Sequence, residues 1–269
     1  VAIAGPGVEA SQTLRLGVGA GTRPLSRRTA QTLAPGAALS VSRDVLDGIL
    51  PGTGVVSLAV SPLAALDVPA LLTALDRFEY TCTEQTVSRA LPLLYAGTLH
   101  KLGALPQDAD TGQRIGEAVA RVLSRQDSNG SFGLWSVGGD DLWLDAYVAD
   151  FLTRAREAGH DVPQTAFTQT LDRLRNAVVN STDFPDGEGE PLAYAAYVLA
   201  RNGRPIIGDL RYFADVRRGA FGSALAQAQI GAGLALLGDR PRADRVFAAA
   251  ADTLAGEKDT DAGRRDYGS

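Results

Sequence analysis

Most of the chain follows a helical pattern of apolar residues. From Pro62 onward, apolar side chains recur with helical spacing, and Gly or Pro interrupts the pattern at nearly every junction. The pattern predicts helices over 67–77, 83–102, 112–125, 141–158, 164–180, 190–202, 207–217, 222–237 and 240–254. Helices of this length joined by short loops favour stacked helical hairpins. We therefore expect a mainly α fold, an α/α toroid of helical hairpins.

The first 60 residues have a different pattern. Segments 13–18, 38–41 and 55–60 alternate in polarity or are rich in β-forming residues, and Gly or Pro lies between them. They are too short and too rich in glycine to build a sheet with its own core. The sequence thus predicts a β-rich segment over 1–60, part of a flanking β domain, followed by a helical domain over 61–269.

Composition excludes several classes of function. Of the 269 residues, 45% are hydrophobic and 21% are charged, as in globular proteins, and no apolar run approaches the roughly 20 residues of a membrane span. The net charge is −5 without a Lys/Arg cluster, so we expect no nucleic-acid partner. The chain begins at Val1 without a signal-like segment, which suggests a piece of a longer protein with any targeting signal outside it.

The single cysteine provides the strongest chemical signal. Cys82 lies at a predicted helix start, so Gln85, three positions on, shares its face. The sulfur can then reach the Gln85 carboxamide carbon, and loss of ammonia would give an internal thioester. Any lysine, hydroxyl or water that reached this acyl group would capture it, so the site must stay dry, with Phe78 and Tyr80 as candidate cover. The alternative is an ordinary reactive thiol at a helix start.

Two segments carry a resemblance to a known family. Residues 76–95, which contain Cys82-Thr83-Glu84-Gln85, and residues 141–152 resemble the thioester domain of bacterial alpha-2-macroglobulins. The similarity extends from about residue 58 to the C-terminus. The family motif usually has Gly before the Cys, where this chain has Thr81. This difference leaves a second hypothesis, a family member that has lost its thioester and acts as an interaction module.

The resemblance implies a protease trap and not an enzyme. Cleavage of a bait region elsewhere in the parent chain would expose the Cys82–Gln85 thioester, and a lysine or hydroxyl of the target protease would attack the Gln85 carbonyl. Glu84 and Tyr80 would support the motif, and no cofactor or metal is implied. The family also implies a broad-spectrum inhibitor for bacterial defence, a flanking β-sandwich domain, and a periplasmic location with an N-terminal lipid anchor outside these residues.

A further turn resembles those of α/α toroids. The segment from Arg125 to Trp135 is similar to the Gln…Gly-Phe-Gly…Trp turn repeated in terpenoid cyclases and prenyltransferases, and Phe221-Gly222 is a weaker second copy. The predicted helices are fewer than such toroids use to close. The resemblance therefore implies a toroid that is incomplete at its C-terminal end.

Other residues support competing hypotheses. Asp140, Asp141 and Asp145 form a group that a toroid enzyme, such as a terpenoid cyclase or glycoside hydrolase, would use, although Asp is also favoured at a helix start. A hydrolase with a Cys nucleophile would need a histidine near Cys82. His100 is about five turns along the same predicted helix, out of reach. We interpret both His100 and His160 as structural.

Overall fold

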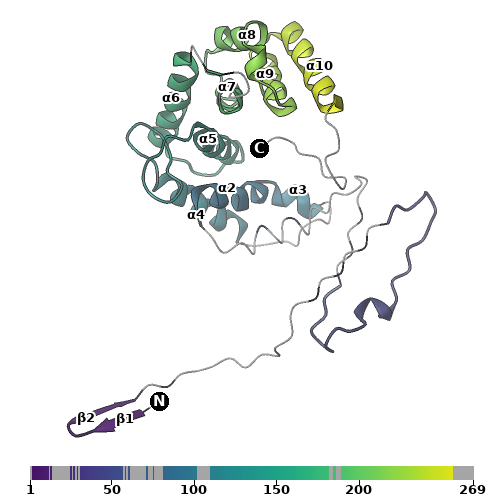
Figure 1. Cartoon of the computed structure of the whole chain (residues 1–269), viewed down its shortest axis with the longest axis vertical. Helices are drawn as coiled ribbons and strands as arrows, with labels where there is room; N and C mark the ends of the chain where they lie inside the picture. Colours follow the sequence, from purple (N-terminus) through teal and green to yellow (C-terminus); the bar gives the residue numbers. More distant parts are fainter. Residues whose placement is uncertain are drawn as a thin grey trace. The chain divides into compact units, whose positions relative to one another are not determined.

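A computed structural model shows the chain as two compact units, Val1–Leu66 and Asp67–Ser269, which are described separately (Figure 1). The structure describes residues 2–11, 13, 25, 27, 29, 31–56, 58, 60, 71, 75, 81–101, 110–181, 184–185 and 189–256.

The first unit contains a short β-hairpin. Strands β1 (Ala2–Gly5) and β2 (Val8–Ser11) pair antiparallel, with Ala2 opposite Ser11 and Gly5 opposite Val8. The connecting turn places Gly7 at a φ of 79°, which glycine adopts without steric cost. A 3₁₀ turn, η1 (Arg43–Leu46), follows.

The strands predicted over 38–41 and 55–60 are not formed in the described part of the unit. The described residues there have no regular structure and are exposed. A strand needs a paired neighbour to satisfy its backbone groups, and β propensity alone does not provide one. The predicted strand over 13–18 lies almost entirely outside the described residues, and the assignment of this unit to a β-sandwich domain stays a prediction.

The second unit is helical. Its described elements are α2 (Thr83–Ala90), the 3₁₀ turn η2 (Leu91–Tyr95), α3 (Ala96–Lys101), α4 (Thr111–Leu123), α5 (Leu142–Glu157), α6 (Gln164–Asn180), α7 (Glu190–Arg201), α8 (Ile207–Asp215), the 3₁₀ turn η3 (Arg218–Ala220), α9 (Ala224–Leu236) and α10 (Arg240–Gly256). From α4 onward, the predicted helix ends agree with these bounds to within two residues. The helix predicted over 67–77 lies mostly outside the described residues.

One predicted helix is divided. The structure replaces the continuous helix over 83–102 with α2, η2 and α3. Pro92 lies in η2 and is the cause, because proline has no backbone N–H and its ring clashes with the carbonyl four residues earlier. The result is a short α2 of eight residues that carries the cysteine site at its N-terminus.

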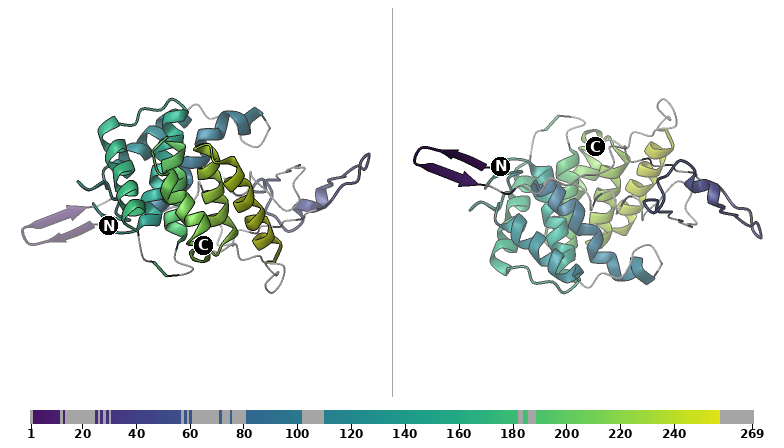
Figure 2. Two further views of the ribbon diagram at one scale, coloured as in Figure 1. Left: turned by 90° about the horizontal axis from the view of Figure 1, so that it is seen from above. Right: turned by 90° about the horizontal axis from the view of Figure 1, so that it is seen from below.

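The helices form an inner and an outer row. Helices α2, α5, α7 and α9 pack against one another in that order. Helix α4 packs on α2, α6 packs on α5 and α7, and both α8 and α10 pack on α9, as the views in Figures 1 and 2 show. This alternation of inner and outer helices is the predicted α/α-toroid arrangement.

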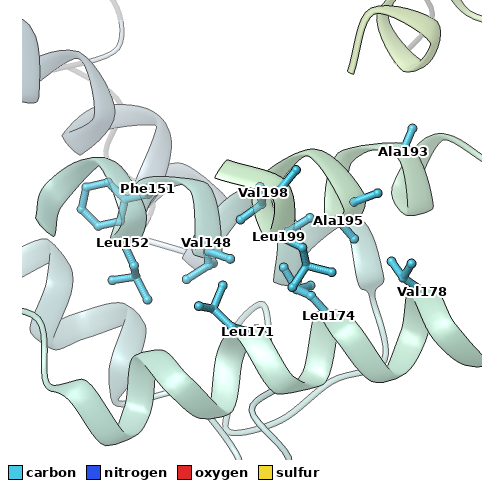
Figure 3. Close-up of a cluster of buried hydrophobic side chains, with 14 of the residues drawn as sticks. Val148, Phe151, Leu152, Leu171, Leu174, Val178, Ala193, Ala195, Val198 and Leu199 are labelled. Carbon is cyan, nitrogen blue, oxygen red and sulfur yellow. The ribbon is translucent and has the colours of Figure 1, made fainter. Parts of the chain in front are cut away.

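The core lies between the two rows. Figure 3 shows Val148, Phe151 and Leu152 of α5 above Leu171 and Leu174 of α6, with side chains of α7 alongside. All of them are buried. Burial of such side chains removes apolar area from water, which is the main favourable term in folding. The inner helices are thereby held at fixed positions around the site described next.

Candidate functional site

Cys82 occupies the N-cap position of α2. Its backbone is extended, with φ −64° and ψ 167°, and its Sγ accepts a hydrogen bond from the Gln85 backbone N–H at 3.4 Å. The first helical hydrogen bond runs from the Thr86 N–H to the Cys82 carbonyl. The cysteine is 4% exposed. The three-residue spacing of Cys82 and Gln85 in the sequence therefore places the Cys82 sulfur next to the Gln85 backbone at the first turn of α2.

The Gln85 carboxamide lies in an unusual environment. Its Oε1 is buried and has no hydrogen-bond partner among the described residues. Burial of an unpaired polar atom costs about 1–3 kcal/mol, and native proteins keep few of them outside functional sites. Cys82 thus provides a buried nucleophile, and Gln85, three residues on in the same helix turn, provides a buried carbonyl that no described residue hydrogen-bonds.

A neighbouring loop fixes the start of α2. The Thr83 N–H donates to the Leu134 carbonyl at 2.9 Å, and its hydroxyl donates to the Gly133 carbonyl at 2.6 Å. The Arg125 guanidinium donates to the Thr83 Oγ1 at 3.0 Å and to the Thr81 carbonyl at 2.8 Å. The toroid-like turn identified in the sequence therefore positions the cysteine. The sequence analysis missed this role of Thr83 and Arg125, because the contacts join residues 42 or more positions apart.

A polar chain connects α2 to α5. The Ser88 hydroxyl donates to Glu84 Oε1 at 3.0 Å and lies 2.9 Å from the Tyr147 hydroxyl. The other carboxylate oxygen of Glu84, Oε2, lies 3.9 Å from the Cys82 sulfur. Burial raises the pKa of Tyr147, and the nearby Glu84 carboxylate adds to this rise while the Ser88 hydrogen bond opposes it. The ring of Tyr147 stacks on Trp143, with centroids 5.0 Å apart.

Of the remaining candidate residues for the cysteine site, the structure describes only the two histidines. Tyr80 and Phe78 are outside the described residues. His160 follows the end of α5, where its backbone N–H donates to the Ala155 carbonyl, and His100 belongs to α3. In the described part of the chain, the hydrogen-bond contacts of the Cys82 sulfur are Gln85 and Glu84, and neither histidine is among them.

The three aspartates have structural roles. Asp141 caps α5 by accepting a hydrogen bond from the Leu144 N–H at 3.1 Å. Asp145 is fully buried and accepts hydrogen bonds from the Phe132 N–H, the Ser131 hydroxyl and Arg173. Asp140 is exposed and pairs with the same Arg173. These contacts join the loop that contains Ser131 and Phe132 to α6. The three aspartates therefore give no support to a toroid enzyme.

Two further features concern metal binding and membrane insertion. Among the described residues, no three His, Cys, Asp or Glu side chains gather where they could hold a metal ion. No helix in the described part of the chain is long and apolar enough to cross a membrane.

Sequence comparisons identify related proteins. Residues 55–182 match the A-macroglobulin TED domain. Alpha-2-macroglobulin of Escherichia coli strain K12 is 34% identical in an alignment of 234 residues that covers 82% of this chain and 14% of that protein. Alpha-2-macroglobulin of Xylella fastidiosa strain Temecula1 is 31% identical over 75% of this chain and 13% of its own length. The chain thus spans about one seventh of these relatives.

Solved structures of bacterial alpha-2-macroglobulins share the fold. The native conformation of E. coli alpha-2-macroglobulin matches with a TM-score of 0.64 and 33% identity over 72% of this chain and 13% of that one. Salmonella alpha-2-macroglobulin reacted with methylamine matches with a TM-score of 0.63 and 33% identity, over 70% of this chain and 13% of that one. Trypsin-activated E. coli alpha-2-macroglobulin matches with a TM-score of 0.58 and 34% identity, over 65% of this chain and 13% of that one.

Proposed function

The helical part of this chain is a thioester (TED) domain of the bacterial alpha-2-macroglobulin family, and on that premise we propose that Cys82 and Gln85 form an internal thioester that captures attacking nucleophiles. The observation that carries the proposal is the geometry of α2. The Cys82 sulfur lies 3.4 Å from the Gln85 backbone nitrogen, and the Gln85 Oε1 is buried with no hydrogen-bond partner among the residues that the structure describes.

The chemistry follows from these two groups. The Cys82 thiol adds to the Gln85 carboxamide carbon, ammonia leaves, and a C–S bond replaces the C–N bond. A primary amine, such as a lysine side chain of a protease, later attacks the same carbon. An amide then forms, the C–S bond breaks, and the Cys82 thiol is released. A thiolate is a much better leaving group than an amine, so the capture step is favourable.

The function of the parent protein is part of the proposal. We infer that the parent is a broad-spectrum protease inhibitor, in which cleavage of a bait region outside these residues exposes the thioester. The family supports this inference, and so do E. coli relatives solved after activation by trypsin and by porcine elastase. We also propose a periplasmic location with an inner-membrane lipid anchor. Fractionation of cells that express the intact protein tests this, and recovery in the cytosolic fraction would contradict it.

The thioester is tested by intact mass and thiol titration before and after methylamine. We expect the intact protein to lack one ammonia and to have no titratable thiol, and methylamine to add once and release one thiol. The Cys82→Ser variant is the matched control because serine is a better N-cap than cysteine and keeps α2 intact. It should show the full sequence mass and no methylamine uptake.

Two other outcomes have distinct meanings. A free thiol together with Glu at position 85 would show a thioester that formed and then hydrolysed. A free thiol together with an unmodified Gln85 would contradict the proposal and would indicate a family member without the bond, in which Thr81 has replaced the usual glycine.

A further inference from the structure

We propose that Glu84 carries the proton in both steps of the thioester reaction, and that Ser88 and Tyr147 hold its carboxylate in position. The inference rests on the proposed thioester and adds residues that act in it. From the sequence alone, Glu84 was assigned only to support of the motif. The structure gives it contacts on both carboxylate oxygens, one with the Cys82 sulfur and one with the Ser88 hydroxyl.

The direction of the hydrogen bonds follows from the chemistry of the groups. An ionised carboxylate only accepts hydrogen bonds, so the Ser88 hydroxyl donates its single hydrogen to Glu84 Oε1 at 3.0 Å. Ser88 then has only lone pairs to offer Tyr147, 2.9 Å away, and the phenol must be the donor. The chain therefore runs from Tyr147 through Ser88 to Glu84, and every hydrogen in it points toward the carboxylate.

The second carboxylate oxygen of Glu84 lies near the Cys82 sulfur. Glu84 Oε2 lies 3.9 Å from the Cys82 sulfur, so the thiol hydrogen has the carboxylate as its acceptor. The sulfur also accepts the Gln85 N–H at 3.4 Å. The anchored oxygen, Oε1, is held by Ser88, which in turn is held by Tyr147, so Oε2 stays near the sulfur and is the oxygen that exchanges a proton.

The protons balance in both directions. When the thioester forms, Glu84 accepts the Cys82 thiol proton, the thiolate attacks the Gln85 carboxamide carbon, and Glu84 returns the proton to the departing nitrogen as ammonia leaves. On capture, Glu84 accepts a proton from the attacking amine and gives it to the Cys82 thiolate as the C–S bond breaks. Neither step needs another reactant, because the carboxylate ends in its original state.

The surroundings keep Tyr147 protonated as a donor. Besides Glu84, the other acidic group that acts on Tyr147 is Asp150 in α5. The Asp150 carboxylate is paired with Arg154 at 2.9 Å and accepts the Tyr194 hydroxyl at 3.0 Å. Its charge is therefore compensated locally. Burial of the phenol and the two carboxylates raise the Tyr147 pKa, so Tyr147 remains a donor to Ser88 under neutral conditions.

The test compares Glu84→Gln with the intact wild-type protein. Glutamine keeps the shape of Glu84 but cannot accept a proton, so we expect thiol release by hydroxylamine to slow by roughly 10²-fold, in the range of general acid–base catalysis.

Tyr147→Phe and Ser88→Ala test the positioning role. Ser88→Ala removes the donor to Glu84, and Tyr147→Phe removes the donor to Ser88, so either variant loosens the hold on the carboxylate beside the sulfur. Thiol release by hydroxylamine should slow in both variants, by less than in Glu84→Gln. A purely structural role would change stability but would leave the rate of thiol release in the folded variants unchanged.

The outcomes separate this proposal from the thioester itself. Wild-type protein without ammonia loss would contradict the thioester. A wild-type thioester together with an unchanged rate of thiol release in Glu84→Gln would overturn only the role of Glu84. If folded Glu84→Gln forms no thioester, Glu84→Asp decides: recovery of the bond supports proton transfer, and its absence overturns it.

Discussion

Asp145 illustrates how one residue joins three parts of the molecule. Its carboxylate has no solvent exposure and accepts hydrogen bonds from the loop residues Ser131 and Phe132 and from Arg173 of α6. A buried charge is tolerated only when it is paired and hydrogen-bonded. The same loop holds Thr83 at the start of α2. Asp145 therefore stabilises the frame around the cysteine without taking part in its chemistry.

Replacement of Asp145 tests this role. Asp145→Asn keeps the size of the side chain but removes the charge that pairs with Arg173. We expect the free energy of unfolding in urea to fall by about 2–3 kcal/mol, which is less than for a fully buried pair because Arg173 is partly exposed. The matched control is Asp140→Asn, whose 97% exposed carboxylate pairs with the same arginine and should change stability by less than about 0.5 kcal/mol. Equal effects of the two variants would contradict the assignment.

At the scale of elements, side-chain caps set the starts of three helices in the described part of the chain. Cys82, Asp141 and Ser223 each accept a hydrogen bond from a backbone N–H three residues on. The three capped helices, α2, α5 and α9, all belong to the inner row. A cap satisfies one of the backbone donors left unpaired at a helix start. In α2 the capping atom is the reactive sulfur, so one geometric requirement serves both helix formation and the proposed chemistry.

Ser223 allows the energy of a cap to be measured away from the site. Ser223→Ala removes the acceptor for the Ala226 N–H, and we expect a loss of about 1 kcal/mol in the free energy of unfolding. Ser223→Asn should retain most of the stability, because asparagine is an equally good cap. Urea unfolding measures both, and a loss as large in Ser223→Asn as in Ser223→Ala would show that capping is not the cause.

At the scale of the whole molecule, the packed layer between α5, α6 and α7 holds the inner row in place (Figure 3). Its members come from three helices separated by loops, and they are buried throughout. Tyr147 lies on the same helix as the core residues Val148 and Phe151. Loosening of this layer would therefore move Tyr147, which holds Ser88 and through it the Glu84 carboxylate.

Leu174 is the side chain to test in this layer. It is fully buried in α6, so Leu174→Ala should leave a cavity and lower the free energy of unfolding by about 2–5 kcal/mol. Val179 lies on the same helix but is 43% exposed, and Val179→Ala should change stability by less than about 0.5 kcal/mol. Urea unfolding measures both variants. A small loss in Leu174→Ala would mean that the layer does not carry the stability of the toroid.

Local features of the sequence predicted a large part of the fold. The helices from α4 onward follow the apolar spacing, because a helix that buries one face needs apolar residues at helical intervals. The division of the helix over 83–102 was missed although Pro92 was visible. The strands predicted over 38–41 and 55–60 do not form among the described residues, because β propensity does not specify a pairing partner.

The sequence by itself determined the spacing of Cys82 and Gln85, because residues three apart in a helix always share a face. Only the tertiary structure decided what surrounds them. The contacts of Arg125 with Thr83, and of Ser88 with Tyr147, join residues 42 and 59 positions apart. No local rule specifies such contacts, since they depend on how whole helices pack. The sequence thus predicts which two groups can come together, and packing determines which distant side chains hold the first turn of α2 in place.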